Sequence, residues 1–250
     1  MSRCSGVLFA LVAATQMIMA NAGVLPPLPP RVLDGHVHIT NFSRFSYSDW
    51  ANASAGTCPC AAPCACDWNV ADWTSASQTL KPTTFVFIEV DADPQMWLDE
   101  VTWVQGLADA GQATIGGLIS KAPPGFGTLS VSDADIAKQL AALRRLPLAR
   151  GVRGYFNLTD ESQWAAVVNH TVLLGDANLS LDVCLGSLGG SASATTALLR
   201  LVRAAPNVTF VLDHLGSPPV LGSPEDRAVW RRTVTALAEH PNVFVKIGGA

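Results

Sequence analysis

The chain has 250 residues, of which 49% are hydrophobic and 14% are charged. Because soluble domains average about 25% charged residues, this apolar composition excludes an intrinsically disordered chain. With 16 basic and 20 acidic residues the formal net charge is -4. No basic excess is available to neutralise phosphates, so the composition argues against a nucleic-acid partner. The length is sufficient for one large α/β domain or two small ones.

The first 22 residues have the pattern of a secretory signal peptide. Arg3 supplies a positive charge, residues 6–20 are an apolar run, and Ala20-Asn21-Ala22 fits a small-x-small cleavage site. We therefore expect residues 1–22 to be removed and the mature protein to be secreted or to lie in the secretory lumen. The alternative, a retained anchoring helix, needs roughly 20 apolar residues, and no second segment is long enough to span a bilayer stably.

Glycosylation sequons support the same compartment. Six of the nine asparagines begin N-x-[ST] sequences, whereas roughly one is expected by chance at this Ser and Thr content. This excess is typical of a glycosylated, and hence eukaryotic, protein. The expected glycosylation sites are Asn41, Asn52, Asn157, Asn169, Asn178 and Asn207.

Four of the six cysteines form a cluster, Cys58-Pro-Cys60-Ala-Ala-Pro-Cys64-Ala-Cys66. In an oxidising lumen this spacing predicts two disulfides, and all three connectivities remain open. The alternative is a Cys₄ zinc site, although CxC spacing is not the usual CxxC. Cys4 leaves with the signal peptide, and Cys184, inside an apolar strand, is expected to be a buried free thiol.

After the signal peptide, short β-branched runs alternate with amphipathic stretches. From the second run onward they repeat at about thirty residues, the length of one βα unit, which predicts a parallel barrel or a doubly wound sheet. We expect one domain over residues 23–250, with a cysteine-rich loop inserted at about 41–80. No GxGxxG or P-loop supports nucleotide binding. The predicted strands are Val32–Ile39, Thr84–Val90, Thr114–Ser120, Gly151–Phe156, Leu179–Leu185, Val208–Asp213 and Val243–Ile247, and predicted helices between them are Asp133–Leu146, Glu161–Leu174, Ala192–Ala204 and Glu225–Glu239.

Histidines lie at the ends of two predicted strands. Alternation along the first strand places Asp34, His36 and His38 on one face, which in a barrel is the interior. His214 follows the sixth strand. Converging imidazoles can hold a divalent metal or polarise a substrate oxygen, and strand carboxyl ends are where barrel enzymes place catalytic groups. Hydrogen-bonded structural histidines are the alternative for each signal.

Three charged residues interrupt apolar strands, namely Glu89, Arg153 and Lys246. An unpaired charge in a core is costly, so they either bind a small-molecule substrate or pair with one another. On the first interpretation Arg153 grips a substrate carboxylate, because its planar guanidinium binds one bidentately. His170 and His240 fall in helical stretches and are expected at the surface.

These segments resemble one family. Asp34-Gly35-His36-Val37-His38 is similar to the DxHxH opening of the amidohydrolase superfamily, and later segments resemble successive blocks of its amidohydrolase-related branch, which includes L-fuconolactonase, L-rhamnonolactonase-like enzymes and 2-pyrone-4,6-dicarboxylate lactonase. The likeness covers about residues 31–249. The blocks are Glu100 to Leu107, Gly151-Val152-Arg153, Leu181-Asp182-Val183-Cys184, Phe210 to Pro218 and Pro241 to Gly249.

The resemblance implies a (β/α)8 TIM barrel that hydrolyses a lactone of a sugar acid or dicarboxylate by attack of an activated water. His36, His38 and His214 match the family's catalytic histidines and its metal ligands, and Glu89, Arg153 and Lys246 are expected to bind substrate. Some relatives use a divalent metal such as zinc and others use none, so the resemblance implies at most one such ion here.

The chain departs from the family pattern in two places. Residues 181–188 carry no histidine, which leaves a metal ligand set incomplete and favours a lactonase over a decarboxylase. The family's eighth-strand aspartate has no counterpart before Ala250, so we expect a barrel truncated after the seventh strand, in a fragment or a short form. The alternatives are a metal-dependent decarboxylase or amidohydrolase on the same barrel, and an inactive secreted glycoprotein that keeps the scaffold.

Overall fold

The structure, a computed structural model, describes residues 32–47, 67–79, 81–154, 157–184 and 192–248. The expected signal peptide, Asn52 and the four clustered cysteines lie outside these ranges. All seven predicted strands are present and form one parallel sheet, in which each strand pairs with the next along the chain. The strands are β1 (Leu33–Val37), β2 (Thr84–Ile88), β3 (Ile115–Lys121), β4 (Ala149–Gly154), β5 (Ser180–Val183), β6 (Phe210–Leu212) and β7 (Val243–Val245).

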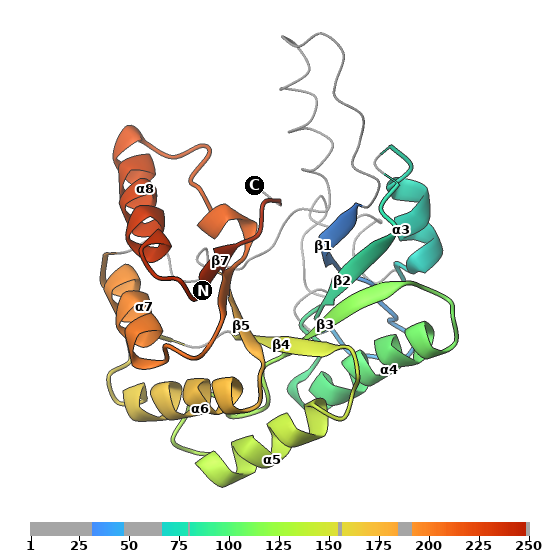
Figure 1. Cartoon of the computed structure of the whole chain (residues 1–250), viewed down its shortest axis with the longest axis horizontal. Coiled ribbons are helices and arrows are strands. Elements are labelled where there is room, and N and C mark those ends of the chain that lie inside the picture. The colour runs from blue at the N-terminus through green and yellow to red at the C-terminus, as the bar shows by residue number, and fades with distance from the viewer. Residues whose placement is uncertain (1–31, 48–66, 80, 155–156, 185–191, 249–250) are drawn as a thin grey trace, which may run out of the picture.

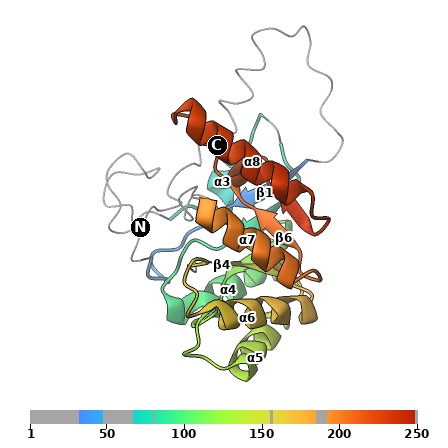
Figure 2. The same ribbon diagram turned by 90° about the vertical axis from the view of Figure 1, so that its left-hand side faces the viewer.

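The helices cover the outer face of this curled sheet (Figure 1). Seen from the side, α5 to α8 follow one another around it (Figure 2). A sequential strand order excludes a doubly wound sheet, in which the order reverses. It confirms the TIM-barrel class, with β1 and β7 at the two ends of the described sheet. The helices are α3 (Val70–Ala76), α4 (Trp97–Asp109), α5 (Asp133–Leu143), α6 (Trp164–Asp176), α7 (Ala192–Ala204) and α8 (Pro224–Ala238), with 3-10 turns η2 (Pro94–Met96) and η4 (His214–Gly216).

The core consists of the apolar residues of the strands and of the inner faces of the helices. Phe87 of β2, Leu118 of β3 and Leu181 of β5 are fully buried, and each contributes about 1.5–3 kcal/mol by leaving water. Gly151 of β4 lies against Ser180 of β5, because a Cβ at Gly151 would lie 2.0 Å from the Ser180 hydroxyl and 2.8 Å from its carbonyl oxygen. This position therefore requires glycine.

Several helices begin at a side chain that caps the first turn. Ser223 and Asp226 form a reciprocal capping box at the start of α8. At α5, Ser132 accepts from the backbone N–H of Asp135 at 3.2 Å, and its hydroxyl donates to the Asp135 carboxylate at 2.7 Å. Ser132 therefore caps α5, although Asp135 binds its hydroxyl and not the Ser132 backbone.

The segment predicted as an inserted loop at about 41–80 has more structure than expected. It contains α3, whose first turn is capped by Asn69 and Asp72. Phe45 and Tyr47 are buried, and the ring of Phe45 lies 5.5 Å from that of Trp103 on α4. The aromatic residues of this segment bury enough apolar surface to join it to the core.

Two expectations about single residues are wrong. Cys184 is part of a disulfide, with its partner outside the described residues, and is not a free thiol. His170 is only 1% exposed, because α6 packs against the β3–α5 loop, where its Nδ1 accepts from the backbone N–H of Gly127. His240 follows α8 and is partly buried. Across the described part of the chain, no helix combines the length and apolarity needed to cross a membrane.

Candidate active site

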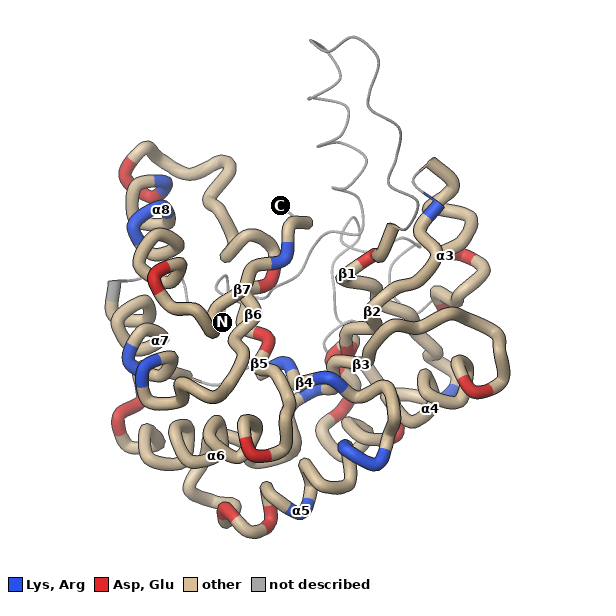
Figure 3. The backbone as a smooth tube through the Cα atoms, in the orientation of Figure 1, with Lys and Arg blue, Asp and Glu red and all other residues tan. Residues whose placement is uncertain are grey.

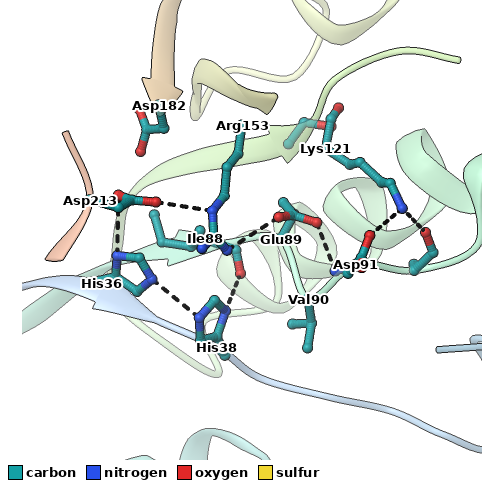
Figure 4. A network of polar contacts seen from close by, with 12 residues as sticks. His36, His38, Ile88, Glu89, Val90, Asp91, Lys121, Arg153, Asp182 and Asp213 are labelled. Carbon is teal, nitrogen blue, oxygen red and sulfur yellow. Dashed lines mark hydrogen bonds and ion pairs between the residues drawn. The ribbon is translucent and has the colours of Figure 1, made fainter. Parts of the chain in front are cut away.

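Every strand of the sheet carries a charged or imidazole side chain at or just beyond its carboxyl end. Figure 3 shows charged positions along the inner strands as well as on the outer helices, and Figure 4 shows most of the inner ones in contact with one another. We call this set the charged belt. Its members are His36 and His38 (β1), Glu89 (β2), Lys121 (β3), Arg153 (β4), Asp182 (β5), Asp213 (β6) and Lys246 (β7).

His36 and His38 point their Nε2 atoms toward each other, at a separation of 3.2 Å (Figure 4). His38 Nδ1 lies 3.0 Å from the carbonyl of Ile88, which can only accept, so Nδ1 carries the ring proton and Nε2 presents a lone pair. His36 Nδ1 lies 3.5 Å from the carboxylate of Asp213. The two rings thus form a chain from Asp213 to Ile88.

Burial keeps both imidazoles neutral. It lowers the pKa of His36 to about 4, against the hydrogen bond to Asp213. It also lowers the pKa of His38 well below its usual value, and repulsion between the two rings when both are protonated acts in the same direction. The three contacts of this chain need three N–H protons, but two neutral rings carry only two in total. When the His36 proton faces Asp213, two lone pairs converge, so the pair can accept a proton or a cation between the rings.

His214 lies beside this pair, with its ring centroid 4.6 Å from that of His36. It follows β6 in a turn where His214, Leu215 and Ser217 all have left-handed backbone angles, at φ 53°, 56° and 54°. The carbonyl of Leu215 accepts from the indole N–H of Trp230 on α8. Non-glycine residues in this region cost about 1–3 kcal/mol each and cluster at functional sites.

Arg153 is enclosed by carboxylates. Its side chain is 4% exposed, and its guanidinium lies 3.3 Å from Glu89 and 3.0 Å from Asp213. Burial raises the pKa of Glu89, and Arg153 opposes this. Of the two interpretations of the sequence, the geometry therefore favours pairing between belt residues over a guanidinium free to grip a substrate carboxylate.

Lys246 is paired in the same way. Its ammonium donates to Asp182 and lies 3.0 Å from Asp213. Burial raises the pKa of Asp182, and Lys246 opposes this. For Asp213 burial also disfavours charge, but the hydrogen bond from His36 and the charges of Lys246 and Arg153 hold its pKa below the usual range. Asp213 is the anion at the centre of the belt.

Sequence reasoning missed the roles of Asp182 and Asp213. Both had the signal that identified Arg153, a charge inside or next to an apolar strand. Asp34, which alternation placed with the histidines, instead accepts from the indole N–H of Trp73 on α3 at 3.2 Å. The register of β1 with β2 shifts between Asp34 and Val37, and this irregularity breaks the expected alternation.

The donor set around His36 fits a divalent metal. His36, Asp213 and His214 each offer a ligand atom, and these atoms lie within 4.8 Å of one another. Imidazole nitrogens with one carboxylate oxygen are the ligands of catalytic zinc sites. The Nε2 of His38 points at the His36 ring. The carbonyl of Ile88 holds His38 in this orientation, as hydrogen-bond partners outside a metal site orient metal-binding histidines.

The expected glycosylation sites differ in exposure where they are described. Asn41 is partly buried, and its carboxamide oxygen accepts from Ser43 at 2.7 Å. The remaining described sites are exposed, and they are Asn157, Asn169, Asn178 and Asn207.

Comparisons with known proteins identify the family of the chain. A family model described as "Amidohydrolase" matches residues 34–250. L-fucono-1,5-lactonase of Burkholderia ambifaria is 29% identical over 125 residues, which are 49% of this chain and 41% of that enzyme. The chain thus matches less than half the length of this curated relative.

Two solved structures share the fold. An amidohydrolase from Burkholderia multivorans with bound zinc has a TM-score of 0.65 at 19% identity, over 88% of this chain and 70% of that chain. Amidohydrolase 2 from Bifidobacterium longum subsp. infantis has a TM-score of 0.59 at 17% identity, over 88% of this chain and 73% of that chain. At these identities the likeness is one of fold.

Proposed function

The chain belongs to the amidohydrolase family, and from this premise we propose that it is a hydrolase that opens a neutral, hydroxylated lactone of a sugar acid. The observation that carries the proposal is the meeting of His36, His38 and His214 at the carboxyl ends of β1 and β6, with Asp213 behind them. The similarity of the chain to a lactonase supports the reaction class.

The charges of the belt favour a neutral substrate over a dicarboxylate. Each of its cations already contacts at least one carboxylate: Lys121 contacts Asp91, and Arg153 and Lys246 share Asp213. Glu89 and Asp182 add two further acids. A substrate carboxylate would meet no unpaired cation among the described belt residues, because the three acids of the belt balance its three cations and Asp91 adds a further acid beside Lys121.

The histidines supply the proton transfers. His214 is less buried than His36 and His38, and burial lowers its pKa, so it is neutral at pH 7. Its Nδ1 lies 3.4 Å from the carbonyl of Gly248, which places the proton there and leaves Nε2 to accept a proton from the attacking water. Asp213 orients His36 and stabilises positive charge that develops on it.

In a metal-bound form, His36, Asp213 and His214 would instead hold a divalent ion, which would act as a Lewis acid that polarises the lactone carbonyl, and Nε2 of His214 would then be a ligand and not the base. The zinc in the Burkholderia multivorans structure supports this possibility, and some lactonases of this type work without metal. We therefore propose at most one ion, such as zinc, as a cofactor.

The test is hydrolysis of a lactone panel by the purified protein, with EDTA or with added Zn²⁺. L-fucono-1,5-lactone is the first neutral compound, and 2-pyrone-4,6-dicarboxylate represents charged ones. We expect turnover of the neutral lactones only. His214→Ala should lower kcat by about 10²- to 10⁴-fold, the usual contribution of a general base, whereas His240→Ala, a histidine outside the site, should retain activity.

The alternatives give different results. Release of CO₂ from a carboxylated substrate would indicate the metal-dependent decarboxylase, and cleavage of amides would indicate an amidohydrolase in the strict sense. Absence of both binding and turnover across the panel would favour a secreted glycoprotein that keeps the scaffold.

A further inference from the structure

Lys121 and Asp91 form a charged pair that the reaction proposed above does not use. Lys121 ends β3, and its register partner on β4 is Arg153, so these two side chains leave neighbouring strands at the same level and on the same face. The Lys121 ammonium donates to the Asp91 carboxylate, and to the carbonyl of Ala92 at 2.9 Å (Figure 4).

This pair reaches solvent, unlike the neighbouring pair of Arg153 and Glu89. The side chains of Lys121 and Asp91 are 18% and 27% exposed, against 4% for Arg153 and 0% for Glu89. The Lys121 ammonium has three N–H donors, and two of them have partners among the described residues. The second carboxylate oxygen of Asp91 accepts no described hydrogen bond.

The backbone holds Asp91 in a conformation that an aspartate adopts at a cost. Its φ is 62°, and its N–H donates to the carboxylate of Glu89 at 2.7 Å. Two side chains, Lys121 and Glu89, thus fix a residue in the left-handed region. Strain of this kind is typical of ligand-binding positions.

We propose that Lys121 and Asp91 bind a hydroxyl group of the substrate and determine specificity for hydroxylated lactones. A hydroxyl accepts one hydrogen bond and donates another, which matches a spare ammonium N–H beside a spare carboxylate oxygen. Both charges already compensate each other, so the pair recognises a neutral ligand group. The inference rests on the proposed lactone hydrolysis and names the part of the substrate that these residues contact.

The experiment compares kcat/KM for a hydroxylated aldono-1,5-lactone with kcat/KM for δ-valerolactone, which has no hydroxyl. For Lys121→Met we expect the ratio of the two values to fall about tenfold, the effect of one hydrogen bond to a charged group. Asp91→Asn should lower it in the same direction. The matched control is Lys138→Met, an exposed lysine of α5, which should leave the ratio unchanged.

A purely structural clamp would give another result. If Lys121→Met lowers kcat/KM for both lactones by the same factor, or for neither, the proposal is wrong. If wild-type protein hydrolyses no lactone, the proposed function fails, and the pair is then tested by calorimetric titration with the aldonolactone. Binding that Lys121→Met weakens about tenfold would still support the subsite, whereas equal binding or no binding would overturn it.

Discussion

Arg153 shows how burial decides the role of a single charged side chain. It lies between Glu89 and Asp213 with almost no exposure, so Arg153→Met would leave the buried Glu89 without this cation and Asp213 with Lys246 alone. We expect a loss of about 3–5 kcal/mol in the free energy of unfolding, the usual cost of breaking a buried ion pair. Urea denaturation with tryptophan fluorescence measures it.

A double-mutant cycle with Glu89→Gln distinguishes pairing from substrate binding. If the two side chains act together, the loss in the double variant should be smaller than the sum of the single losses by about 0.5–3 kcal/mol. Arg200→Met, which removes an exposed arginine bound to Glu161, is the control and should cost about 1 kcal/mol or less. A raised KM with unchanged stability in Arg153→Met would instead restore the substrate-carboxylate interpretation.

At the residue scale, the sequence predicts which side chains belong to the candidate site, but it predicts the contacts of these side chains less well. His36, His38, Glu89, Arg153 and Lys246 stand out as polar interruptions of apolar strands, and the carboxyl ends of parallel strands bring them together. Their partners depend on local backbone geometry. The register shift in β1 that separates Asp34 from the histidines leaves no mark in the alternation of residue types.

At the scale of elements, His170 joins α6 to the loop before α5. Its Nδ1 accepts from the Gly127 N–H and its Nε2 lies 3.2 Å from Asp133, so the neutral ring fits both partners. Burial lowers the pKa of His170 below 6.5, and Asp133 opposes this. The unfolded chain therefore binds the proton more tightly than the folded protein. The contribution of His170 to the free energy of unfolding is complete above pH 6.5 and is lost as the pH falls.

We expect the stability advantage of the wild type over His170→Gln to narrow between about pH 7.5 and about pH 5, by up to about 1.4 kcal/mol for each pH unit. Urea unfolding of both proteins across this range measures it. A constant difference would show that the ring does not change its protonation on unfolding.

The start of α8 supports a second prediction at this scale. Ser223 caps the helix whose Trp230 binds the strained turn after β6. Ser223→Ala should lower the free energy of unfolding by about 1 kcal/mol. Thr235→Ala, at an exposed position within α8, should be neutral or slightly stabilising because alanine has the higher helix propensity. Equal effects of both variants in thermal denaturation would contradict a capping role.

The ends of elements are less predictable from sequence than their centres. Each predicted strand overlaps an observed one, since apolar β-branched runs suit buried parallel strands. The strand ends are set by residues such as Asp91 and His214, whose left-handed angles are not signalled by glycine. α3 lies in a segment that composition presents as a loop, although its capping box at Asn69 and Asp72 is readable in the sequence.

For the whole molecule, the disulfide at Cys184 supports the proposal of an oxidising compartment. Cys184 follows β5 directly and is 1% exposed. We expect it to resist alkylation in the unfolded, unreduced protein and to react after reduction. Peptide mapping of the unreduced protein by mass spectrometry should identify its partner. A bond from Cys184 to Cys58, Cys60, Cys64 or Cys66 would exclude the two disulfides expected within that cluster.

Loss of this bond should destabilise the whole fold. For Cys184→Ser we expect a decrease of about 2–5 kcal/mol in the free energy of unfolding, as for other native disulfides. An unchanged midpoint after reduction, with native-like circular dichroism, would show that the bond does not constrain the folded domain.

The charged belt also limits how related sequences can diverge. Because Asp213 contacts both Arg153 and Lys246 while Glu89 and Asp182 bind the same two cations, loss of one member leaves an excess charge on its neighbours. Substitutions at these positions should therefore occur in pairs that remove opposite charges together, such as joint replacement of Glu89 and Arg153 by apolar residues. Single replacements should persist only in lineages that have also changed the chemistry of the site.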